Sequence, residues 1–275
     1  MNINKKLLLN IACGNVYIKN KSWINLDIIS KDKYVKKINL LKKLPFNNET
    51  VDAIYCAHFL EHIPVHKVKD FLKECFRILK KNGVLRLVLP DFESLTKEYL
   101  KQVKLKNFTK AKIVLISIID QCVRRVPGGE LGKFYNILLN EKKNKKHLIK
   151  YLNYLNGVNF IKYKNKNRDL FFFIEKIYFF IIEKFINFWI KSVVFFLPKA
   201  FVEQNISFAR IGEMHHWLWD FYSLYDHLKQ SGFNKIKKLT YNKSSYKGHE
   251  LFMFDKNKKN EKTRGIESMY VEGIK

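Results

Sequence analysis

Cysteine is scarce and dispersed in this sequence. The four cysteines, Cys13, Cys56, Cys75 and Cys122, form no CxxC pair and show no Cys/His zinc spacing. This pattern excludes a scaffold held by disulfides and favours reduced thiols in a cytoplasmic protein. We therefore predict a cytoplasmic location and no metal site.

Long uncharged apolar runs are also absent. Residues 170–201 are strongly apolar, yet no uncharged stretch among them exceeds about seven residues, too few to cross a bilayer. The Leu run after Lys5 and Lys6 is short and interrupted by Asn10, so we expect no targeting segment there. Gly and Pro number only 11 and 5, and 47% of the residues are apolar, which excludes disordered and collagen-like classes.

Acidic residues are few relative to basic ones. The 275 residues include 52 Lys or Arg and 25 Asp or Glu, a formal net charge of +27. Such a surface attracts nucleic acid or anionic membranes, although a coding bias toward Lys, Asn, Ile and Phe produces the same composition. The excess is uneven, because residues 101–205 carry 21 basic and 7 acidic side chains. The sequence therefore indicates a basic insertion within a less charged fold.

Strand-like and helix-like segments alternate on either side of this insertion. The apolar spacing from Val65 to Lys80 predicts an amphipathic helix that stops at Asn82-Gly83, and a second helix is predicted over 223–232. Apolar runs predict strands at 7–12, 23–27, 35–40, 51–56, 84–89, 235–241, 250–254 and, at an edge, 268–274.

Strands that are apolar throughout and separated by helices indicate a parallel sheet covered on both faces. We therefore predict an α/β fold: a Rossmann-like, mostly parallel seven-stranded sheet with helices on both faces. Residues 1–100 and 206–275 form this domain, and residues 101–205 form a helical, basic and aromatic insertion.

Residues 170–201 of the insertion predict an amphipathic helix. At about 100° per residue, the charged side chains fall on one half of the helix and the Phe, Ile, Tyr, Trp and Leu side chains on the other. Such a helix packs on the core or on a second subunit, or it lies in a membrane interface. The second alternative predicts peripheral contact with the inner face of the membrane.

A small-residue turn, Ala12-Cys13-Gly14, follows the first predicted strand. Small residues let backbone amides approach a ligand closely. Asp27 ends the second strand, where an acid accepts hydrogen bonds from the hydroxyls of a ribose. The two features together favour a nucleotide-like ligand at this edge of the sheet.

These segments resemble the class I S-adenosylmethionine-dependent methyltransferases, and in particular the type 11-like group often associated with cell-surface glycan biosynthesis. The resemblance covers roughly residues 7–100 and 210–275 and leaves the insertion unmatched. It is carried by Leu9 to Gly14, Trp23 to Asp27, Leu44 to Phe46 with Val51 to His62, Arg77 to Arg86 with Leu89 to Asp91, His216 to Asp220, Ser231 to Phe233 and Glu267 to Lys275.

The resemblance implies S-adenosyl-L-methionine as the cofactor. The residues that it implies for binding are Asn10, Ala12, Cys13, Gly14, Asp27, Asn39, Leu40 and His58. Ala12 stands where a Gly is common in the family, and we expect ordinary backbone angles at this position.

Methyl transfer from a sulfonium requires mainly that donor and acceptor are positioned and water excluded, whereas a hydroxyl acceptor also requires a base. The catalytic candidates are Asp91, which follows the predicted strand at 84–89, His58 and His215, and His62 and His216 are further candidates for the base. A packing role is the alternative for the histidines.

The preferred hypothesis is a methyltransferase that acts on a glycan, a glycolipid or another small-molecule acceptor. Two alternatives stay open. The basic insertion, with Lys142 to Lys146 near Tyr151 and Tyr154, suggests RNA as the substrate, although no RNA-binding module is recognisable. A scaffold without catalytic activity would keep the Rossmann-like shape and bind a membrane or a partner through the insertion.

Overall fold

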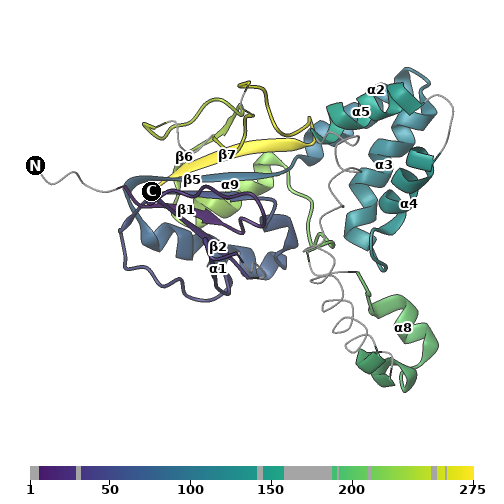
Figure 1. The fold of residues 1–275 in the computed structure, drawn as a ribbon, viewed down its shortest axis with the longest axis horizontal. Helices are drawn as coiled ribbons and strands as arrows, with labels where there is room; N and C mark the ends of the chain where they lie inside the picture. Colours follow the sequence, from purple (N-terminus) through teal and green to yellow (C-terminus); the bar gives the residue numbers. More distant parts are fainter. Residues whose placement is uncertain are drawn as a thin grey trace, which may run out of the picture.

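A seven-stranded sheet organises the structure. The computed structural model describes residues 6–28, 32–140, 145–157, 188–190, 192–209, 212–248, 253–257 and 259–275. The strands are β1 (Leu8–Ile11), β2 (Trp23–Asp27), β3 (Val35–Lys37), β4 (Val51–Ala57), β5 (Leu79–Pro90), β6 (Asn234–Leu239) and β7 (Ser268–Ile274). Figure 1 shows the sheet at one end of the molecule and a group of helices at the other.

The strand order is β3-β2-β1-β4-β5-β7-β6. Neighbouring strands from β3 to β5 run parallel, and only β7 is antiparallel to its neighbours β5 and β6. The predicted Rossmann-like, mostly parallel seven-stranded sheet is therefore confirmed. The prediction that residues 268–274 form an edge strand is wrong, because β7 lies inside the sheet and β6 forms the edge.

Helices α1 (Val65–Ile78) and α9 (Phe221–Gln230) pack on one face of the sheet. α1 buries Val68, Leu72 and Cys75 at helical spacing, which is why its apolar pattern is readable in the sequence. α9 begins with a capping box between Asp220 and Ser223, two residues before the predicted start. The two helices also contact each other, so they form one layer.

Loops, not helices, cover the other face in the part of the chain that the structure describes. Phe254 packs on Tyr55 and Trp23 with ring centroids 4.6 and 5.0 Å away, and Tyr241 and Tyr246 pack around them. This differs from the predicted helices on both faces, because the described residues between β1 and β2 form turns and bends. Of the strand predicted at 250–254, the described part, Met253 and Phe254, is a turn.

A second group of helices, called the helical unit below, lies beyond the carboxyl ends of the parallel strands (Figure 1). α2 packs on α3 and α3 on α4, and this unit has its own buried core, which includes Leu95, Val114 and Leu155. α2 runs across the boundary predicted at residue 100, so these helices begin at Phe92. The helices are α2 (Phe92–Lys104), α3 (Phe108–Val123), α4 (Gly129–Asn140), α5 (Lys145–Asn156) and α8 (Lys199–Asn205).

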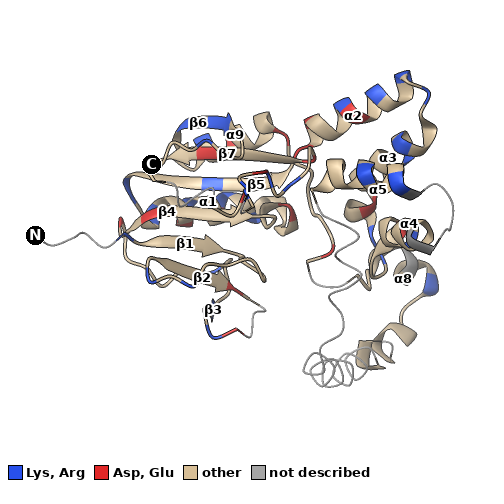
Figure 2. Ribbon diagram, turned by 45° about the horizontal axis from the view of Figure 1, so that its top comes forward, with Lys and Arg blue, Asp and Glu red and all other residues tan. Residues whose placement is uncertain are grey.

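The predicted helix over 170–201 is described only in part, because residues 170–187 and Lys191 lie outside the described residues. Residues 188–190 and 192–195 are helical, and Phe195 and Phe196 are 83% and 84% exposed. Among the described helices, none is long and apolar enough to cross a membrane. Lys and Arg residues occur on α2, α3, α5 and β6 in the described part of the chain (Figure 2).

Candidate functional site

The turn after β1 is the first element of the site. Ala12 has φ 54° and Gly14 φ 50°, both in the left-handed region. The expectation of ordinary backbone angles at Ala12 is therefore wrong, and this conformation costs a residue with a side chain about 1–2 kcal/mol. The Cys13 amide donates to the Leu26 carbonyl at 3.2 Å and the Gly14 amide to Asp27 Oδ2 at 2.9 Å, so β2 holds the turn in this shape.

Cys13, Gly14 and Asp27, three of the residues predicted to bind the cofactor, surround an open side of this turn. A Cβ built on Gly14 would meet no atom within 4 Å, so a ligand can approach the backbone there. The carboxylate of Asp27 lies at the rim, half-buried. Burial, followed by the negative charge of Asp27, raises the pKa of Cys13 to about 12, so its thiol stays neutral.

The buried side chain of Asn10 stabilises the backbone around the turn. Its side chain is 1% exposed, and Nδ2 donates to the Val16 carbonyl at 2.9 Å and to Asn25 Oδ1 at 3.2 Å. It therefore orders the backbone after β1, and direct contact with a cofactor stays a prediction.

Asn39 and Leu40 follow β3 at the same edge of the sheet. The exposed Asn39 accepts a hydrogen bond from the Leu41 amide at 3.0 Å through Oδ1. Leu40 is 3% exposed and belongs to the main core. The loop after β3 is thus fixed, and its predicted contacts with a cofactor remain untested.

His58 comes directly after β4. Parallel pairing sets Ile11 opposite Cys56, which brings His58 next to the turn after β1. His58 has φ 50°, its amide donates to the Val88 carbonyl at 2.7 Å, and Nδ1 lies 3.1 Å from Glu61 Oε1. The side chain is 30% exposed and so remains accessible.

A cavity of about 250 Å³ opens at this point. It contains His58, His62 and His215 of the candidate bases, together with two groups that the sequence did not single out as catalytic: Glu61 and Glu267. Glu61 and His62 belong to a short 3-10 helix after β4, η1 (Leu60–His62), and Glu267 precedes β7. The remaining lining comes from the end of β5, the helical unit and the connections: Pro90, Leu95, Ser117, Gln121, Gly212 and Leu218.

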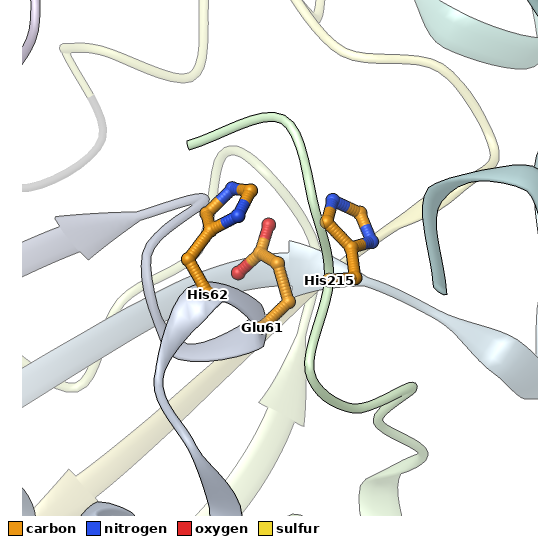
Figure 3. A group of neighbouring side chains, drawn as sticks. All are labelled: Glu61, His62 and His215. Carbon is orange, nitrogen blue, oxygen red and sulfur yellow. The ribbon is translucent and has the colours of Figure 1, made fainter. Parts of the chain in front are cut away.

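The segment around His215 passes between the sheet and the helical unit. The His215 amide donates to the Gln121 carbonyl of α3 at 2.8 Å, and the His216 amide donates to the Glu61 carbonyl of η1 at 2.7 Å. His62 Nδ1 lies 2.9 Å from the Met214 carbonyl. These bonds close one wall of the cavity and bring His215 beside Glu61 and His62 (Figure 3).

Burial changes the pKa values of the ionisable side chains that line the cavity. Burial lowers the pKa of His215 to about 4, so this imidazole is neutral near pH 7. Burial raises the pKa of Glu267 to about 8, which favours the protonated acid. Burial opposes the charge of Glu61, but the hydrogen bond from His58 and the nearby imidazoles lower its pKa below the ordinary value. The cavity therefore contains one ionised and one protonated carboxyl group.

Asp91 lies outside this cavity lining. Its side chain is 1% exposed, and Oδ2 accepts hydrogen bonds from Ser94 Oγ at 2.6 Å and from Lys238 Nζ at 2.8 Å. This geometry favours a role in joining β5, α2 and β6, and catalysis by Asp91 stays a prediction. His216 is exposed and does not line the cavity, and Trp219 is fully buried in the core.

Residues 28–87 match the family model described as "Methyltransferase domain". Over these residues, which are less than half of the chain, the protein is similar to methyltransferase domains. The sheet order together with this match gives the class I S-adenosylmethionine-dependent methyltransferase fold, and S-adenosylmethionine is the methyl donor of that fold. The predicted domain type and cofactor are thereby confirmed.

Other similar proteins extend this comparison. An uncharacterized protein of Methanocaldococcus jannaschii is 34% identical over 108 residues, which cover 34% of this chain and 46% of that protein. The match thus spans less than half the length of this relative.

Two solved structures align with 98% of the chain at low scores. One is an S-adenosylmethionine-dependent methyltransferase from Archaeoglobus fulgidus, with 13% identity, 86% of that chain covered and a TM-score of 0.39. The other is a possible histamine N-methyltransferase from Thermotoga maritima, with 15% identity, 82% covered and a TM-score of 0.36. Such scores add nothing about the acceptor.

Proposed function

We propose that the protein transfers the methyl group of S-adenosylmethionine to a small acceptor of the glycan or glycolipid class. The position of the cavity carries this proposal, because it opens at the carboxyl ends of β4 and β5 beside the turn after β1. Ligands of open α/β sheets bind at this edge. A volume of about 250 Å³ is below the usual range of about 300–1,000 Å³ for ligand pockets, so the cavity suits one small group of a larger acceptor.

The turn after β1 fits the methyl donor. Gly14 leaves its backbone open to a ligand, and the Asp27 carboxylate at the rim suits the hydroxyls of a ribose. When bound, S-adenosylmethionine supplies an electrophilic methyl group. Ala12 takes up the left-handed conformation of the turn in spite of its side chain, so the absence of Gly there gives no support to a scaffold without activity.

His58 is the base in this proposal when the acceptor atom is a hydroxyl oxygen. Nδ1 lies 3.1 Å from the Glu61 carboxylate, which accepts a hydrogen bond from an N–H there and leaves Nε2 to take up the acceptor proton. Burial keeps His215 neutral on the opposite wall, and burial keeps Glu267 protonated as a hydrogen-bond donor. The closed wall between them excludes water from the transfer.

Calorimetry with S-adenosylhomocysteine tests the donor site. We expect a Kd in the micromolar range, about −8 kcal/mol, and no heat and no thermal shift would refute methyl transfer and leave the scaffold hypothesis. Transfer of a labelled methyl group to free sugars, nucleotide sugars and lipid-linked sugars then tests the acceptor class. His58→Asn should lower kcat by about 10²-fold, whereas His66→Asn on the exposed side of α1 should leave kcat unchanged. Equal kcat in the two variants would exclude His58 as the base.

We further propose that the protein contacts an anionic membrane through the apolar segment of the insertion, residues 170–201. Trp189, Phe195 and Phe196 are 63%, 83% and 84% exposed, and aromatic side chains of this kind enter membrane interfaces. Pelleting with anionic vesicles should fall for the double variant Phe195→Ser, Phe196→Ser and persist for Tyr222→Ser, a control whose side chain is 72% exposed on α9. Equal pelleting of all forms would contradict membrane contact.

RNA is the less favoured partner. Tyr151 is 7% exposed and its hydroxyl donates to Glu98 Oε1 at 3.0 Å, so its ring is not available for stacking on a base. Retention on RNA that falls steeply with salt would favour RNA over the membrane.

A further inference from the structure

Three side chains from distant segments converge at the cavity wall. Glu61, His62 and His215 each offer one possible ligand atom, and these atoms all lie within 4.8 Å of one another. Figure 3 shows the Glu61 carboxylate between the two imidazoles. Two imidazoles and one carboxylate form a donor set that suits divalent first-row transition ions.

The Glu61 carboxylate has one oxygen that the protein leaves unsatisfied. Glu61 is 1% exposed, and Oε1 lies 3.1 Å from His58 Nδ1. Oε2 is buried and has no hydrogen-bond partner among the described residues. Because a buried, unpaired polar oxygen is costly, a cation beside Oε2 would relieve this cost.

The His62 imidazole is held as the imidazole of a metal ligand usually is. The Met214 carbonyl accepts hydrogen bonds only, so His62 Nδ1 carries the hydrogen at 2.9 Å and Nε2 keeps a lone pair. A metal-binding histidine typically donates its other N–H to such a carbonyl. His215 is fixed by the 3.0 Å contact of Nε2 with the Gln121 side chain, and its ring centroid lies 4.8 Å from that of His62.

We propose that Glu61, His62 and His215 bind one divalent first-row transition ion, such as Mn²⁺ or Zn²⁺, in the wall of the cavity. Bonds of about 2.0–2.2 Å place ligand atoms about 3–4 Å apart, so small side-chain rotations suffice to close the site from its present spacing. Three protein ligands leave a coordination position for a water or a substrate atom. Under the proposed function, on which this last step rests, the ion polarises the acceptor atom next to His58.

Metal titration of the full-length protein tests the site. After chelation and dialysis, Mn²⁺ binding is followed by electron paramagnetic resonance, with Zn²⁺ and Mg²⁺ as competitors. We expect one tightly bound Mn²⁺ per chain, displaced by Zn²⁺ and not by an equal concentration of Mg²⁺, which prefers sites made of oxygen atoms alone. No bound Mn²⁺ in the wild-type protein would overturn the inference.

Substitutions then assign the ligands. Glu61→Gln keeps the size of the side chain and His215→Asn removes an imidazole, and each should weaken Mn²⁺ binding at least about tenfold. His66→Asn on α1, an exposed position, is the matched control and should bind Mn²⁺ like the wild type. Equal affinity in Glu61→Gln and the wild type would overturn the site, and the wild-type titration decides the question if a variant does not fold.

Calorimetry with S-adenosylhomocysteine on the same samples separates the two proposals. Donor binding without stoichiometric Mn²⁺ overturns the metal site and leaves the methyltransferase function standing. Mn²⁺ binding without donor binding supports the metal site and refutes the methyltransferase function.

Discussion

Replacing Arg86 with Met should cost several kcal/mol of folding stability. Arg86 is fully buried on β5, with Nε 2.9 Å from Asp255 Oδ2 and Nη1 2.7 Å from Glu272 Oε1, and both carboxylates are fully buried as well. Its guanidinium also donates to carbonyls of the loop that follows β6. Met fills much of the same space but removes the guanidinium that pairs with both buried carboxylates.

The size of the effect follows from burial. Removing one partner of a buried ion pair costs about 3–5 kcal/mol, a large part of the roughly 5–15 kcal/mol that stabilises a typical domain. Lys80→Met on the same strand is the control, because the Lys80–Asp52 pair is 41% and 23% exposed and such pairs contribute about 0–1 kcal/mol. Urea unfolding followed by tryptophan fluorescence measures both variants.

The stability lost in Arg86→Met should also depend on pH. Burial raises the pKa of Asp255 above its ordinary value, with Arg86 opposing the shift. A carboxyl whose pKa is raised in the folded state destabilises the fold when ionised, and this cost disappears as the pH falls through the folded-state pKa. The penalty of Arg86→Met should therefore shrink as the pH is lowered from neutral. A cost below about 1 kcal/mol, or a penalty that grows on acidification, would refute the reasoning.

Three further results are expected. Asp27→Asn should weaken S-adenosylhomocysteine binding about 10–100-fold in calorimetry, because hydrogen bonds to a charged group contribute about 1.5–3 kcal/mol. Iodoacetamide should label Cys122 first, as judged by mass spectrometry of the native protein, because the other three cysteines are buried. Gly265→Ala should lower Tm by several degrees, because its Cβ would lie 1.8 Å from the Leu155 carbonyl oxygen.

Control variants at other positions are available for the Asp27 and Gly265 substitutions. Asp226→Asn, at an exposed position on α9, should leave donor binding unchanged. Gly132→Ala has no atom within 4 Å of its new Cβ and should leave Tm almost unchanged. Labelling of Cys13 as fast as Cys122, or equal Tm values for the two alanine variants, would contradict the described packing.

The strands were predictable because their neighbours bury both faces. β2 coincides with its predicted range, 23–27, and α1 ends two residues before Lys80. The interior position of β7 was not predictable, since Glu272 reads as a surface residue. Its partner Arg86 is 186 residues away, and only the folded sheet brings the two together.

The neighbouring positions of Gly14 and Asp27 were predictable from the sequence, and the side chains of the cavity wall were not. Gly14 and Asp27 both lie near the ends of adjacent strands, so local patterns place them together. Glu61 and His62 are adjacent, but His215 joins them from more than 150 residues away, which no short spacing reveals. The left-handed angle at Ala12 is set by hydrogen bonds to β2, not by the preference of alanine.

The cavity wall is completed late during synthesis, because it depends on the backbone hydrogen bonds of His215 and His216. The first sixty residues contain the whole edge that we assign to the methyl donor. The wall of the cavity needs the segment around His215, which leaves the ribosome some 150 residues later and then joins η1 to α3. A nascent chain of the methyltransferase domain therefore carries its donor edge well before it has a chamber in which a methyl group can be transferred.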